Sequence, residues 1–139
     1  GIRPTFEYIS FFKSVHTLKQ AWEIVQRSGE DDATLILDAF HNWNSESTLE
    51  DLREIPLDKI SHYHIDDAAQ GKGPGSQTDP DRVMIGDGQI DLAAEIEVLR
   101  EIGYDGTVSL ELFNAEWWAK DPAETLKIGL ERMKELFGE

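Results

Sequence analysis

The feature that most constrains this chain is a unit that occurs four times along its 139 residues. Each unit is a short apolar run with strand character, followed by a segment whose apolar residues recur at three- and four-residue steps, as on one face of a helix. The strand segments are expected at residues 5–9, 34–40, 60–65 and 108–113. Strands that alternate with helices imply parallel βαβ units with right-handed crossovers. The sequence therefore predicts an α/β fold of four βα units with parallel strands, forming one unit over residues 1–139.

Capping residues mark where the helices of these units begin and end. The helices are expected from Thr17 to Gly29, from Ser47 or Thr48 to before Pro56, from Asp91 to Gly103, and from Asp121-Pro122 onward. Glycine suits the left-handed stop of a helix, and proline suits its first position. Residues 66–88 are polar and rich in glycine and proline, so they are expected to form a long loop, which in a compact domain is usually functional or mobile.

Four βα units do not close a barrel, because a (β/α)8 barrel needs eight units and about 250 residues. The chain is therefore expected to form either a small open α/β sheet or half of a barrel. In a half-barrel the two outer strands would expose backbone N–H and C=O groups and apolar sides. That arrangement needs a missing half or a second copy, so a homodimer or pairing with a missing half-barrel is expected.

Charge and composition exclude several classes of function. The chain has 13 Lys and Arg against 28 Asp and Glu, a net charge of −15, which argues against nucleic acid and against an anionic membrane surface as partners. The absence of cysteine excludes disulfide frameworks, Cys-type zinc sites and thiolate nucleophiles. No apolar run approaches the ~20 residues of a membrane helix, and no signal-peptide pattern is visible. A cytoplasmic protein is expected.

Each strand segment carries one polar residue with metal-ligand chemistry: Glu7, Asp38, His64 and Glu111. In a parallel sheet, functional groups collect at the carboxyl ends of the strands. Three carboxylates and an imidazole that converge there would repel one another unless a cation lay between them. Mn²⁺, Mg²⁺ or Co²⁺ would suit these ligands, and Zn²⁺ also fits. A lone strand glutamate is more often structural than a ligand, and it is the coincidence in all four units that favours a metal site.

Four segments carry further polar patterns: Leu37-Asp38-Ala39-Phe40-His41, His62-Tyr63-His64-Ile65-Asp66-Asp67, Arg82-Val83-Met84-Ile85-Gly86-Asp87-Gly88 and Ser109-Leu110-Glu111-Leu112-Phe113-Asn114. Together they resemble the xylose-isomerase-like TIM-barrel superfamily, and within it the sugar phosphate isomerase/epimerase group. The resemblance covers nearly the whole chain but only strands five to eight of the family's barrel. It implies the C-terminal half of a (β/α)8 TIM barrel, with the missing partner being an N-terminal half.

The resemblance also implies roles for individual residues. It assigns metal ligation to Glu7, Asp38, His64 and Glu111, and substrate contacts to His41 and Arg82. Glu7 and Glu111 would in addition be the catalytic acid and base. The family usually has proline before this Gly-x-Gly, and in this chain Ile85 occupies that place.

The activity implied is that of a divalent-metal-dependent sugar or polyol isomerase or epimerase, which transfers a proton next to a carbonyl through a metal-stabilised enediolate. Loss of a β-hydroxyl from the same enolate would give a dehydratase of the inosose or 3-dehydroshikimate type. The superfamily also contains three-zinc endonucleases, but their Asp-x-His motif would fall on Asp81-Arg82-Val83, and valine cannot bind metal. A different hypothesis is a non-catalytic half-barrel that binds metal and self-associates.

Overall fold

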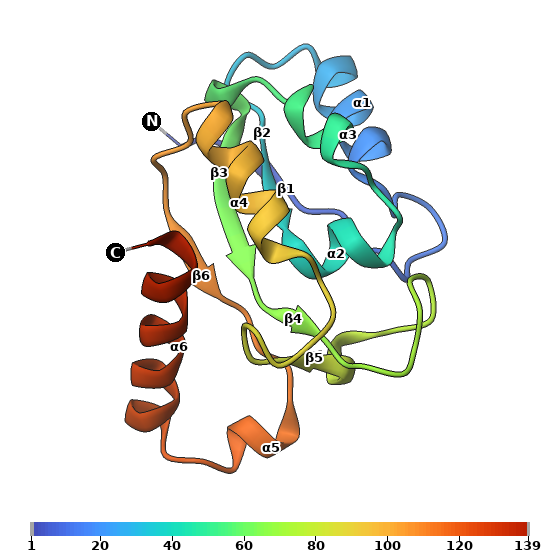
Figure 1. The fold of residues 1–139 in the computed structure, drawn as a ribbon. Helices are drawn as coiled ribbons and strands as arrows, with labels where there is room; N and C mark the ends of the chain where they lie inside the picture. The colour runs from blue at the N-terminus through green and yellow to red at the C-terminus, as the bar shows by residue number, and fades with distance from the viewer. Residues whose placement is uncertain (1, 139) are drawn as a thin grey trace.

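The structure is a computed structural model that describes residues 2–138. Its centre is a four-stranded parallel sheet in the order β1-β2-β3-β6, formed by Thr5–Phe6, Thr34–Asp38, Ile60–Ile65 and Val108–Leu110. Helices alternate with these strands, and α1 (Leu18–Ser28), α3 (Leu49–Arg53) and α4 (Leu92–Glu101) lie along one side of the sheet (Figure 1). The remaining long helix, α6 (Pro122–Phe137), lies beside β6. The predicted α/β fold of four βα units is confirmed.

Local capping explains where the helices begin. Thr17 accepts a hydrogen bond from the backbone N–H of Gln20, and Gly29 closes α1 in the left-handed conformation with φ 69°. The side chains of Thr48, Asp91 and Asp121 cap α3, α4 and α6 in the same way. All four helices predicted from the sequence are present.

Three predicted strands are shorter than expected. Asp38 ends β2 because its side chain accepts a hydrogen bond from the backbone N–H of His41 and so caps α2 (Ala39–Asn44). Residues 39 and 40, predicted as strand, are therefore helical. β1 and β6 also stop early, which leaves Glu7 and Glu111 just beyond the strand ends. A short helix after β6, α5 (Ala115–Trp118), was not predicted.

The predicted loop over residues 66–88 has more structure than a loop. It contains a two-stranded antiparallel sheet of β4 (Asp67–Ala68) and β5 (Arg82–Val83), and the 3-10 turn η2 (Asp79–Asp81). Another 3-10 turn, η1 (Leu57–Lys59), directly precedes β3. Asp67 accepts hydrogen bonds from the backbone N–H groups of Gly86, Gly88 and Ile90 at 3.1, 3.0 and 2.9 Å. These bonds fix the segment that leads into α4.

The core lies between the sheet and the helices. Its fully buried side chains include Leu18 and Ala21 of α1, Leu35 and Leu37 of β2, Tyr63 and Ile65 of β3, and Ile96 and Leu99 of α4. The side chains on the other face of the strands are more polar, and the candidate site lies on that face. None of the helices formed by the described residues is long and apolar enough to cross a membrane.

One edge of the molecule leaves apolar surface uncovered. A groove of about 730 Å³ runs between β6 and α6, and its lining includes Leu110, Trp118, Leu126 and Leu130. Trp118 and Leu126 are 66% and 70% exposed. β1 and β6 are the outer strands, and neither pairs with a further strand among residues 2–138. These open edges match the expectation for half of a barrel.

Candidate metal centre

Four side chains, each at or just beyond the end of a different strand, meet at the carboxyl end of the sheet. Glu7, Asp38, His64 and Glu111 each offer one ligand atom, and these atoms all lie within 4.8 Å of one another. His64 Nδ1 lies 3.1 Å from a Glu7 oxygen, 3.2 Å from a Glu111 oxygen and 3.9 Å from Asp38 Oδ2. The structure therefore brings together the four residues for which sequence reasoning predicted metal ligation.

Strand register produces this convergence. Asp38 and His64 are direct neighbours across β2 and β3, and His64 is opposite Ser109 of β6. Glu111 follows Ser109 by two residues, which places the two on the same side of an extended segment. Glu7 follows β1 directly. Residues 104 positions apart in the chain thus share one small volume.

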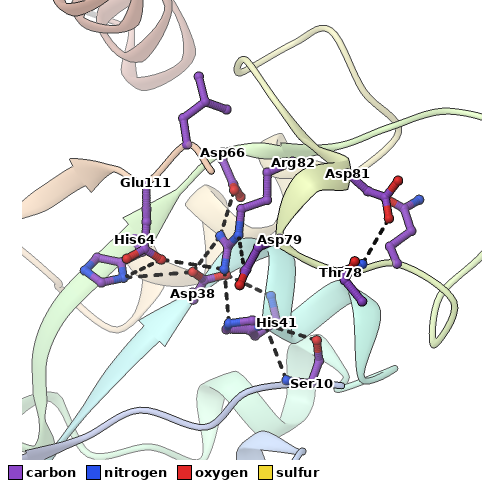
Figure 2. A network of polar contacts seen from close by, with 12 residues as sticks. Ser10, Asp38, His41, His64, Asp66, Thr78, Asp79, Asp81, Arg82 and Glu111 are labelled. Carbon is purple, nitrogen blue, oxygen red and sulfur yellow. Dashed lines mark hydrogen bonds and ion pairs between the residues drawn. The ribbon is translucent and has the colours of Figure 1, made fainter. Parts of the chain in front are cut away.

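Arg82 is the buried cation of the site. Its side chain is 1% exposed, and its guanidinium lies 2.9 Å from Asp38, 2.7 Å from Asp66 and 3.2 Å from Asp79. Figure 2 shows these aspartates around the guanidinium. Nη2 of Arg82 lies 3.6 Å from Glu111 Oε2. Arg82 therefore contacts two of the four candidate ligands, Asp38 and Glu111.

The Arg82 contacts set the charge of Asp38. Burial disfavours the charged carboxylate, but Arg82 and the backbone N–H of His41 outweigh that cost, and the pKa of Asp38 is lowered. The pKa of the neighbouring Asp66 is raised well above its usual value, mainly by burial and then by the charge of Asp38. Asp38 is thus held as an anion, as a metal ligand must be.

Three polar contacts hold the ring of His41, and in one of them the backbone N–H of Ser10 lies 3.4 Å from Nδ1. Its Nε2 lies 3.0 Å from an Arg82 nitrogen, and its Nδ1 lies 3.0 Å from Ser10 Oγ. Because arginine has only donors, Nε2 must accept the hydrogen bond from Arg82, which requires an imidazole without a proton on Nε2. Burial lowers the pKa of His41, which favours this neutral ring. His41 and Arg82 are both 1% exposed, so the structure places these two predicted substrate residues beneath the ligand cluster, and their substrate contacts stay predictions.

The donor set fits a divalent cation. Hydrogen bonds to Glu111 and Glu7 raise the pKa of His64 to about 10. The protonated imidazole of His64 therefore supplies a positive charge between these two carboxylates. A divalent ion would replace that proton and satisfy the same oxygens. Three carboxylates and one imidazole are hard to borderline ligands, which suit Mn²⁺, Mg²⁺, Co²⁺ or Zn²⁺. The side chains of Glu7 and Glu111 are 24% and 26% exposed, which leaves the centre open to an ion and a small ligand.

Sequence reasoning missed the residues that support the site. Asp66 and Asp79 pair with Arg82, and Ser10 bonds to His41. Asn44 in turn donates to Ser10 Oγ at 2.8 Å. Except for Asp79, which is three residues before Arg82, these partners are at least 16 positions apart in the chain. They lie in loops or short helices, where apolar periodicity carries no signal. The aspartate pair Asp66-Asp67 directly after β3 was the one local sign.

The family model for the xylose isomerase-like TIM barrel matches residues 1–136 of the chain. The chain belongs to this family. The curated relatives that it resembles include inosose isomerase from Bacillus velezensis, with 38% identity over 132 residues, which cover 94% of this chain and 47% of that protein. They also include 3-dehydroshikimate dehydratase from Pseudomonas putida, with 28% identity over 94% of this chain and 21% of that protein.

Solved structures of the family agree with this assignment. A crystal structure of the IolI protein with a bound zinc atom superimposes with a TM-score of 0.93 and 34% identity, over 99% of this chain and 50% of that one. The structure of L-ribulose 3-epimerase gives a TM-score of 0.74 at 22% identity, which speaks for the fold alone. The chain spans about half the length of the inosose isomerases it matches. The expected equivalence to half of a TIM barrel is confirmed.

Proposed function

We propose that Glu7, Asp38, His64 and Glu111 bind one divalent metal ion, and that this xylose isomerase-like chain carries the metal and acid–base machinery of a sugar or polyol isomerase or epimerase. The observation that carries the proposal is the meeting of four ligand atoms within 4.8 Å, from residues at or just beyond the ends of four separate strands. Relatives named inosose isomerase and L-ribulose 3-epimerase support this reaction class. A zinc-bound neighbour supports a divalent metal.

The chemistry follows from where the carboxylates lie. A divalent ion, when bound, polarises adjacent carbonyl and hydroxyl oxygens and so acidifies the C–H beside them. Glu7 and Glu111 follow the ends of β1 and β6, approach His64 Nδ1 at 3.1 and 3.2 Å, and are both partly exposed. One of these carboxylates can remove the proton from carbon, and the other can return it to the opposite face or to the adjacent carbon.

Arg82 and His41 lie on the buried side of the candidate ligands and would hold them in position. Arg82 lies 2.9 Å from Asp38 and 3.6 Å from Glu111, so it holds both carboxylates in place and balances part of their charge. His41 fixes the guanidinium by accepting a hydrogen bond from it. Direct contacts from Arg82 or His41 to substrate oxygens would need the guanidinium or the imidazole to become exposed.

Two other functions have support of their own. The likeness to 3-dehydroshikimate dehydratase supports a dehydratase, in which a hydroxyl group leaves from the carbon next to the deprotonated one. The open β1 and β6 edges, and a length half that of relatives, support a half-barrel that binds metal without turnover until its edges are covered.

Metal binding by the isolated chain tests the proposal first. We expect titration calorimetry to find one Mn²⁺ or Co²⁺ site, and Glu111→Gln to weaken it by about tenfold or more, because a neutral amide is a poor ligand. Glu116→Gln is the matched control, since Glu116 is exposed on α5. Unchanged affinity in Glu111→Gln would remove Glu111 from the ligand set.

Turnover separates the reaction classes. The chain, with Mn²⁺ or Co²⁺, is incubated with ketoses or inosose in D₂O and followed by NMR. Deuterium at the carbon next to the carbonyl with a changed configuration indicates an epimerase, a moved carbonyl indicates an isomerase, and an unsaturated product indicates a dehydratase. Metal binding without any exchange identifies the non-catalytic half-barrel.

A further inference from the structure

A second polar cluster lies on the opposite face of the site strands. Its centre is Glu95 of α4, whose side chain is buried between the helix and the sheet. Glu95 Oε2 accepts hydrogen bonds from Asn42 Nδ2 at 3.0 Å and from the Tyr63 hydroxyl at 2.8 Å. Asn42 Oδ1 in turn accepts a hydrogen bond from the Tyr8 hydroxyl. One carboxyl group on α4 is thus connected to three separate segments.

Each of the three connected residues is the chain neighbour of a site residue. Tyr8 follows Glu7, and Tyr63 precedes His64. Asn42 follows His41 on α2, the helix that Asp38 caps. Neighbouring side chains of a strand point to opposite faces, so the hydrogen bond that holds Tyr63 on one face of β3 also fixes the direction of His64 on the other. The bond to Asn42 holds the helix that Asp38 caps, and the bond to Tyr8 holds the segment that carries Glu7.

Burying a carboxyl group in the core costs free energy that an apolar side chain does not. Leu92, Ile96 and Leu99 of the same helix face the core with apolar side chains, and an apolar residue at position 95 would avoid the cost of burying a carboxyl group. A connected polar network, by contrast, accepts only one arrangement of its partners. The candidate metal site on the other face of the sheet also needs one fixed arrangement, because its four ligand atoms come from segments that are far apart in the chain.

We propose that Glu95 is a positioning residue for the metal centre, which holds Glu7, Asp38 and His64 in ligand geometry through Tyr8, Asn42 and Tyr63. This inference rests on the proposed metal function. It assigns to α4, which contributes no ligand, the task of setting the relative positions of β1, β2 and β3 at their carboxyl ends.

Cobalt binding tests the proposal, because the visible spectrum of Co²⁺ reports the arrangement of its ligands and not the stability of the protein. In Glu95→Ala we expect Co²⁺ affinity to fall by about tenfold, as for other residues that orient ligands, and the spectrum of the bound ion to change. Glu95→Gln should restore both toward the wild-type values, because its amide oxygen can still accept the bonds from Asn42 and Tyr63. Glu97→Gln is the control, since Glu97 is exposed on the same helix.

Tyr63→Phe keeps the test valid if Glu95→Ala does not fold. It deletes one hydroxyl group and should weaken and alter Co²⁺ binding in the same direction. The matched control is Tyr104→Phe, because the Tyr104 hydroxyl bonds to Thr107, away from the site. If Glu95→Ala or Tyr63→Phe is folded by circular dichroism and binds Co²⁺ with the wild-type affinity and spectrum, the positioning role is wrong and Glu95 is structural only.

Failure of the metal proposal can be told apart from failure of this one. If the wild-type chain binds no Co²⁺, the metal function falls, and crystal structures then decide the role of Glu95. We expect the ligand atoms of Glu7, Asp38 and His64 to separate in Tyr63→Phe or Glu95→Ala relative to the wild type. Unmoved ligand atoms in those variants would overturn the positioning role.

Discussion

Arg82 and Asp38 form a buried ion pair with a nitrogen–oxygen distance of 2.9 Å, and each side chain is only 1% exposed. Asp38 is at once a candidate ligand, the cap of α2 and the partner of this guanidinium. Arg82 also contacts Asp66, Asp79 and Glu111, so four carboxyl groups surround its single positive charge. The ligand cluster therefore depends on a residue that lies in the segment between β3 and α4.

Replacing Arg82 by methionine should destabilise the protein strongly. The substitution leaves Asp38 buried without its counter-charge, and removing one partner of a buried pair typically costs about 3–5 kcal/mol. We expect a loss of this size in the free energy of unfolding from urea titrations. Arg53→Met is the control, because Arg53 pairs with Glu101 at the surface, where about 1 kcal/mol or less is expected. Equal losses in both variants would contradict the role assigned to the buried pair.

Stability should fall as pH rises from about 5 to 7, because of Glu95. Burial raises the pKa of Glu95 to about 7 from its usual 4.5, so between these values the folded protein keeps a proton that the unfolded chain has lost. The neutral group contributes its full stability at low pH, and that contribution is lost as pH rises through 7. The groups facing it are Tyr8, Tyr63, Asn42 and the charge of Asp38.

Glu95→Gln isolates this effect, since glutamine does not titrate. The difference in unfolding free energy between the variant and the wild type should shift in favour of the variant by about 2–3 kcal/mol between pH 5 and pH 8, given 1.36 kcal/mol per pKa unit. Urea titrations at both pH values measure it. A constant difference across this range would show that Glu95 titrates with an ordinary pKa.

Much of this architecture could be predicted from the sequence because it is encoded locally. Apolar periodicity located the strands and helices, and capping residues such as Thr17 and Asp91 located the helix ends. One ligand-type residue per strand end was enough to predict the cluster, because parallel strands bring their ends together. Residues 39 and 40 were predicted wrongly since their apolar character suits a strand, whereas the cap made by Asp38 starts a helix there.

The support beneath the cluster could not be predicted, because it depends on contacts between distant segments. Arg82 meets Asp38 across 44 positions, and nothing near either residue signals the pairing. Glu95 did leave a trace, since it lies three residues after Leu92 and one before Ile96, on the apolar face of α4. A charged residue at such a position indicates a buried polar contact, but not its partners.

Asp38→Asn should separate helix capping from metal binding. Asparagine caps helices about as well as aspartate, so α2 should persist, while the lost negative charge should weaken metal binding. Wild-type protein with Mn²⁺ at 100 times its Kd should gain about 2.7 kcal/mol, seen as a rise in Tm that EDTA abolishes. The variant should lack this rise. A full Mn²⁺-dependent rise in Asp38→Asn would exclude Asp38 as a ligand.

The isolated chain should self-associate through its open edges, and more strongly as salt is added. The groove between β6 and α6 exposes apolar side chains that need a partner surface, and β1 and β6 present unpaired strand edges. Each copy carries a net charge of −15, so repulsion opposes pairing at low ionic strength and is screened as salt rises. Light scattering coupled to size-exclusion chromatography at 0.02 and 0.5 M NaCl measures the mass.

Leu130→Glu tests whether the groove is the contact, because Leu130 lines it and is half exposed. The added charge should shift the chain toward monomer without loss of helical content. Leu57→Glu is the matched control, since Leu57 is similarly exposed but lies outside the groove. A wild-type chain that stays monomeric at both salt concentrations would show that these edges do not pair with a second copy, and that covering them requires a different half-barrel.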